Sequence, residues 1–170
     1  VADVAALAET VLPASINAVY TAQPALTPEL AAAALRLYKA TTQDVFITAD
    51  YKRPKLFAKR ELVLDVSELE AVADAADVAL FKAHFLPLLA QMRSLTKDTR
   101  FDIAFRVMDK DPDDRMDTVH TFHLDGGKYR MLQALVGPGT QWLANADVAD
   151  WDDTHVQPQT GAPIHQLEEG

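Results

Sequence analysis

The chain has 170 residues, a length that suits one domain with its own hydrophobic core. Its net charge of −9 argues against a duplex nucleic-acid binder and against docking on an anionic membrane surface, because both normally require a basic face. The absence of cysteine excludes disulfides, thiolate metal sites and cysteine nucleophiles, so any metal must be held by histidine and carboxylate.

No apolar run approaches the roughly 20 residues of a membrane-spanning helix. Residues 1–12 lack the basic segment that begins a secretory signal peptide. We therefore expect a cytoplasmic protein with no membrane partner. The chain begins with valine rather than methionine, which indicates a processed chain or a fragment.

The first third of the chain is predicted to be helical. Residues 4–19 are rich in alanine, with apolar residues at helical spacing and an interruption at Pro13. Thr27, Pro28 and Glu29 are typical of a helix start, with a hydroxyl at the N-cap, proline at the first helical position and an acid in the first turn. This helix should continue over residues 30–40, and the β-branched run at 44–49 predicts a short strand.

Residues 51–60 are basic and hold five of the sixteen lysines and arginines. Such a run can grip an anionic ligand, but a solvated face is the favoured interpretation. The apolar run 62–66 has no firm assignment. Ser67 and Glu70 predict a capping box that opens a helix reaching about residue 95, which Pro87 should break or kink. His84 falls in this helix and is interpreted as a surface or core histidine.

The second half of the chain is predicted to be rich in strands. We expect strands at residues 100–108, 118–124, 130–136 and 140–143, and a further strand at 163–167. Between them lie a charged turn at 109–117, glycine turns at 126–127 and 137–139, and an acidic loop at 145–161. The aspartates of the charged turn lack the glycine and glutamate of an EF-hand, so we interpret this segment as a solvated turn.

Helices followed by a run of strands predict an α+β fold. We expect a single domain over residues 1–170, in which a mainly helical part, 1–97, covers an antiparallel sheet formed by a β-rich part, 98–170.

His123 and Asp125 are the candidate metal ligands. In a strand, residues two apart point to the same face, so this His-x-Asp pair would offer an imidazole nitrogen and a carboxylate oxygen to one point. That is two thirds of the facial triad of two histidines and one carboxylate that holds non-haem Fe(II). A surface strand with a polar pair is the alternative interpretation of the dipeptide alone.

The residues that follow His123 and Asp125 extend this pair into a longer motif. In order they are Arg130, Leu132, Leu135, Gly137, Gly139, Thr140 and Trp142. With His123 and Asp125 they resemble the first half of the jelly-roll core of Fe(II)/2-oxoglutarate-dependent dioxygenases. They are still more similar to an uncharacterised bacterial family with a Phe-His-x-Asp segment followed by Gly-Pro-Gly-Thr-x-Trp-Leu. That family has no established reaction, and some members are encoded near zinc-homeostasis genes. The resemblance covers about residues 100–170.

The resemblance implies a double-stranded β-helix core, of the jelly-roll or cupin kind, with the N-terminal helices packed on it. It leaves open whether this core is complete at its C-terminal end. It implies that His123 and Asp125 bind Fe(II) and that Arg130 lines the 2-oxoglutarate site or pairs with Asp125. The superfamily pattern also needs a distal histidine and a basic residue for the far carboxylate of 2-oxoglutarate. These would lie beyond residue 170, or His165 or His155 would serve as the third ligand.

The function implied is hydroxylation of an unknown substrate, a small molecule or a protein, by an oxygenase that uses Fe(II) and 2-oxoglutarate. One alternative is a cupin-like protein that handles zinc without redox chemistry, because zinc accepts the same ligands. A second alternative is a non-catalytic interaction domain, whose alanine-rich helices bind a partner or another copy of the chain as a homo-oligomer.

Overall fold

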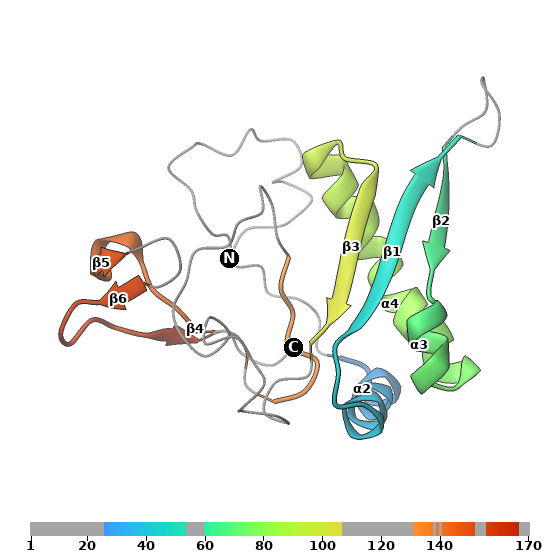
Figure 1. Ribbon diagram of the computed structural model, residues 1–170, viewed down its shortest axis with the longest axis horizontal. Coiled ribbons are helices and arrows are strands. Elements are labelled where there is room, and N and C mark those ends of the chain that lie inside the picture. Colours follow the sequence, from blue (N-terminus) through green and yellow to red (C-terminus); the bar gives the residue numbers. More distant parts are fainter. Residues whose placement is uncertain are drawn as a thin grey trace. The chain divides into compact units, whose positions relative to one another are not determined.

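The computed structural model describes residues 26–53, 60–106, 131–137, 139, 141–151 and 156–166. The chain divides into two compact units, Val1–Val107 and Met108–Gly170 (Figure 1). The boundary lies C-terminal to the predicted change of character near residue 98, because the strand that follows this change belongs to the first unit.

The first unit contains a three-stranded antiparallel sheet. Its strands are β1 (Val45–Lys52), β2 (Glu61–Asp65) and β3 (Arg100–Phe105), in the order β2-β1-β3 (Figure 1). The strands predicted at 44–49 and 100–108 are confirmed as β1 and β3. The unassigned run at 62–66 forms most of β2, which pairs with β1 through Ala49 and Leu64.

Helices bury one face of this sheet, because buried and exposed side chains alternate along β1. Val45, Ile47 and Ala49 are buried, whereas Phe46 between them is 50% exposed. The buried face meets helix α4 (Ala75–Thr96), where the ring of Phe81 makes an edge contact with Phe105 of β3, at 4.9 Å between the ring centroids.

Helix α2 (Pro28–Ala40) begins as its sequence predicts. The hydroxyl oxygen of Thr27 accepts the backbone N–H of Leu30 at 3.2 Å, and Pro28 occupies the first helical position. The helix buries Leu30, Ala33, Ala34 and Leu37, which recur at helical spacing.

Two helices, α3 (Ser67–Val72) and α4 (Ala75–Thr96), replace the single helix predicted from Ser67. The predicted capping box is wrong. Ser67 lies inside α3, and its hydroxyl donates a hydrogen bond to Oδ1 of Asp65 at 2.8 Å instead of capping the helix. Asp74 caps α4 by accepting the backbone N–H of Asp77 at 2.8 Å.

Pro87 lies inside α4 and does not end it, so of the predicted break or kink the break is wrong. A proline in a helix removes one backbone hydrogen bond and crowds the preceding turn. The buried side chains of Phe81, Phe85 and Leu89 flank Pro87 on both sides, and their burial favours a continuous helix at this point. The helix ends at Thr96, and its C-cap, Lys97, adopts a left-handed conformation with φ 62°.

Among its described residues, the second unit contains two short antiparallel ladders. Strand β4 (Gln141–Trp142) pairs with β7 (His165–Gln166), and β5 (Val148–Trp151) pairs with β6 (Val156–Pro158). A 3₁₀ turn, η2 (Asn145–Asp147), precedes β5. The strands predicted at 140–143 and 163–167 are confirmed as β4 and β7.

Two predictions for this unit are wrong. The acidic stretch 145–161, predicted to be a loop, contains the β5–β6 ladder, because cross-strand pairing outweighs a composition typical of loops. Residues 131–136, predicted to be part of a strand, form none. The apolar run there has no paired neighbour among the described residues, and strand preference alone does not make a strand. The segments 107–130 and 152–155 lie outside the described residues, as do the strand predicted at 118–124 and the turns at 109–117 and 126–127.

Candidate functional site

Three of the four predicted site residues lie outside the described residues. These are the predicted ligands His123 and Asp125 and the predicted 2-oxoglutarate contact Arg130. His120 and His155 also lie outside them, as does the charged turn at 109–117. His165 is therefore the predicted ligand whose surroundings can be followed in the structure.

His165 lies on β7 directly opposite Trp142 on β4. The two rings are stacked, with 4.3 Å between their centroids and 21° between their planes. Both residues are exposed, Trp142 by 38%. Because cross-strand neighbours on one face of an antiparallel ladder interact directly, this pair fixes the plane of the imidazole ring.

Gly139, two residues before β4, is bound to the same ladder. Gly137 has φ +75°, a conformation that favours glycine. The side-chain amide of Gln166 on β7 donates a hydrogen bond to the backbone oxygen of Gly139 at 3.3 Å. Gly139, Gln141 and Trp142 are therefore tied to β7 by a side-chain hydrogen bond, backbone pairing and ring stacking.

A donor set for a metal is not complete within the described residues. In that part of the chain, no three His, Asp or Glu side chains come together as metal ligands would. His84 is half-buried on α4, in the other unit, as its sequence context predicts. A three-residue site built on His165 would therefore need donors such as His123 and Asp125.

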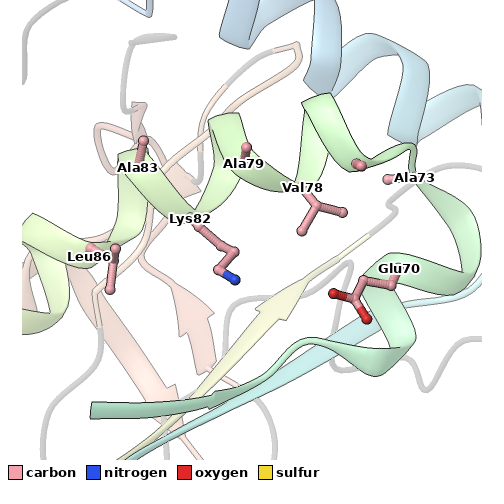
Figure 2. A pocket seen from close by; sticks show the side chains of 8 residues that line it. Glu70, Ala73, Val78, Ala79, Lys82, Ala83 and Leu86 are labelled. Atoms are coloured by element: carbon pink, nitrogen blue, oxygen red, sulfur yellow. The ribbon is translucent and has the colours of Figure 1, made fainter. Parts of the chain in front are cut away.

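A second feature, in the first unit, is not among the sequence predictions. A groove of about 600 Å³ follows one side of α4 (Figure 2). Its lining is mainly apolar and consists of Glu70, Ala73, Ala75, Val78, Ala79, Lys82, Ala83 and Leu86. The charged ends of Lys82 and Glu70 extend into the same space from α4 and α3 (Figure 2). The spacing of Ala75, Ala79 and Ala83 is the sequence signal for it, because residues four apart share one helix face.

Two further charged features, Asp77 and the basic stretch at 51–60, have a structural or a solvated setting. Asp77, which is buried, accepts hydrogen bonds from Arg36 of α2, and these lower the pKa of the Asp77 carboxyl more than its burial raises it. Lys52, Arg53 and Arg60 at the two ends of the basic stretch are exposed, which agrees with a solvated face, and residues 54–59 lie outside the described residues.

The fold and the described site define a class, an α+β protein with small antiparallel sheets. A family model matches residues 2–170, nearly the whole chain, and the chain belongs to that family, DUF1826, described as a protein of unknown function. Neither the curated proteins nor the solved structures contain a significant match to the chain. Within the described residues, no helix is both long enough and apolar enough to cross a membrane.

Proposed function

We propose that the chain is an oxygenase dependent on Fe(II) and 2-oxoglutarate, in which His123, Asp125 and His165 hold the metal. The observation that carries the proposal is the pairing of His165 with Trp142. It ties the candidate third ligand to Trp142, one of the residues that follow His123 and Asp125 in the jelly-roll resemblance.

The stacked geometry is compatible with metal binding. An imidazole coordinates through nitrogen lone pairs that lie in the plane of its ring, and Trp142 covers a face of the ring rather than its edge. A packed and oriented histidine is what a metal site requires, because ligands held in place by neighbours need no reordering when the metal binds.

The strand pairing also supports a jelly-roll core. The β4–β7 ladder encloses the β5–β6 ladder in sequence, so the four strands pair in a nested order. A jelly roll is an antiparallel double-sheet fold in which strands distant in sequence pair in this nested manner. The described ladders contain two strands each, so such a core would need further strands from outside the described residues.

In this proposal the chain's own residues bind and orient the reactants. His123, Asp125 and His165 would leave open positions on the metal, and Arg130 would hold a carboxylate of 2-oxoglutarate through its two-pronged guanidinium. Iron, 2-oxoglutarate and O₂ would together supply the oxidising chemistry, with one oxygen atom of O₂ entering a C–H bond of the substrate and the other entering the succinate that 2-oxoglutarate becomes on losing CO₂.

The test is the metal content of the chain purified anaerobically without chelator, with a titration of 2-oxoglutarate alongside. We expect about one Fe(II) per chain and a visible absorption band on addition of 2-oxoglutarate, because a facial triad leaves sites for the cosubstrate. His123→Ala and Asp125→Ala should each abolish stoichiometric binding. His84→Ala, which removes a histidine in the other unit, is the matched control and should keep the metal.

Each outcome has a definite meaning. Full metal binding by both His123→Ala and Asp125→Ala would overturn the proposal. Loss of metal in those two variants, with no loss in His165→Ala, would assign the third position to a residue other than His165. Stoichiometric zinc with no 2-oxoglutarate band would favour the zinc-handling alternative.

A further inference from the structure

The groove along α4 is lined mainly by small apolar side chains and carries one positive and one negative side chain. Ala75, Ala79 and Ala83 are exposed and lie four residues apart on α4, and Leu86, one of the exposed large apolar side chains, continues the lining. Small side chains let the axis of a second helix come close, and the surface between helix ridges is what another helix fills. The floor therefore has the shape and chemistry of a helix-packing surface.

The two charged residues make the groove self-complementary. Lys82 on α4 and Glu70 on α3 extend into the groove (Figure 2), and in the part of the chain that the structure describes no ion pair involves either of them. A two-fold axis brings each surface patch against an identical one, so that residue i meets j and j meets i. A cation and an anion on the same patch can then form two equivalent pairs.

We propose that this groove binds a second copy of the chain, with α4 packed antiparallel against α4 and Lys82 of each copy facing Glu70 of the other. The charge pattern selects this occupant, because one lysine and one glutamate across an apolar floor satisfy each other in a symmetric dimer without any further partner. The proposal concerns the first unit alone and does not depend on the metal chemistry proposed above.

Charge reversal tests the pairing directly. The mass in solution is measured by sedimentation equilibrium over micromolar to millimolar concentrations. We expect a monomer–dimer equilibrium for the natural chain and a dissociation constant raised about tenfold or more in Glu70→Lys or Lys82→Glu, since each substitution places like charges together twice per dimer. The double variant Glu70→Lys, Lys82→Glu restores opposite charges and should recover the dimer.

Three results would overturn the proposal. One is a monomer at all concentrations, which would leave the groove to another segment of the same chain or to a different partner. Another is a dimer that neither single variant weakens, which would place the interface elsewhere. The last is a double variant no better than the single ones. Circular dichroism of every variant separates loss of the dimer from loss of the fold.

Cross-linking gives an independent measurement, because the chain has no cysteine of its own. Ala79→Cys in the groove should be joined to its counterpart by a short bis-maleimide at concentrations where the dimer forms. Ala32→Cys places the same substitution on an exposed position of α2 outside the groove and should remain monomeric under the same conditions. Equal cross-linking of both variants would reveal random collision and count against the interface.

Discussion

Arg36 on α2 and Asp77 in the first turn of α4 form a two-pronged ion pair across 41 residues of sequence. The Nε group of Arg36 donates to Oδ2 of Asp77 at 2.8 Å, and its Nη2 group donates to Oδ1. The Asp77 side chain is only 5% exposed, whereas that of Arg36 is 56% exposed. The pair therefore fixes α2 to the start of α4 through a carboxylate that is buried and a cation that keeps part of its hydration.

Asp77→Ala should lower the free energy of unfolding by about 1–2 kcal/mol. This figure is at the low end for charged hydrogen bonds, because water can partly replace the carboxylate around the half-exposed Arg36. Arg36→Met should destabilise the chain at least as much, since it leaves the buried Asp77 without its cation. Urea unfolding of both variants and of the double variant measures the coupling, and additive effects would contradict a direct interaction.

The Arg36–Asp77 pair also predicts how stability depends on pH. Hydrogen bonding from Arg36 lowers the pKa of Asp77 from its ordinary value of 3.8, so the unfolded chain binds this proton more readily than the folded chain. The stabilisation is therefore fully present above about pH 4 and is lost as the pH falls through the lower folded value. The stability difference between the natural chain and Asp77→Ala, measured by urea unfolding, should shrink on acidification.

Asp65 should contribute to acid sensitivity in the same direction. Hydrogen bonds from the hydroxyl and backbone of Ser67 lower the pKa of Asp65. The Asp77→Ala variant should therefore still lose some stability at low pH, because Asp65 remains in it. If the stability difference between the natural chain and Asp77→Ala grew below pH 4 instead, a lowered pKa of Asp77 in the folded chain would be contradicted.

Glu68 closes the open end of the β1–β2 ladder. Its Oε2 accepts the backbone N–H of Phe46 at 2.8 Å, at a point of β1 that β2 does not reach. Glu68→Ala should cost about 0.5–1 kcal/mol in the free energy of unfolding. Glu68→Gln keeps an acceptor oxygen and is the matched control, with a smaller loss expected. We also expect the backbone amide of Phe46 to exchange its hydrogen faster in Glu68→Ala but not in Glu68→Gln, because only the alanine variant loses the acceptor.

Phe81 is the centre of the core between α4 and the sheet. It is fully buried and contacts the ring of Phe105 on β3. Phe81→Ala should lower the free energy of unfolding by about 3–5 kcal/mol, because it removes apolar burial and leaves a cavity. Leu35→Ala, on the exposed side of α2, should change it by no more than about 0.5 kcal/mol. Thermal unfolding of the two variants compares them, and similar shifts would contradict this view of the core.

Local signals predict several elements correctly. The start of α2 follows from Thr27, Pro28 and Glu29, since an N-cap hydroxyl and a proline act on backbone groups within one turn. Strands β1 and β3 follow from runs rich in β-branched and aromatic residues. The position of His165 in a strand likewise follows from its neighbours.

Prediction from local sequence fails where a residue outside the local motif offers a competing hydrogen bond or strand pairing. Ser67 and Glu70 match the capping-box pattern, but Asp65 provides another acceptor for the Ser67 hydroxyl. The acidic stretch 145–161 is typical of a loop, yet Trp151 and Val156 are partners in a ladder.

The sequence alone thus determined where several of the described helices and strands begin, because capping and alternation depend on residues within a few positions of one another. The tertiary structure decided which of these elements meet. It joined Arg36 to Asp77, stacked His165 on Trp142 and set Lys82 and Glu70 along one groove. These relationships depend on the packing of whole elements, whose free energy is shared among many residues and is not carried by any short pattern.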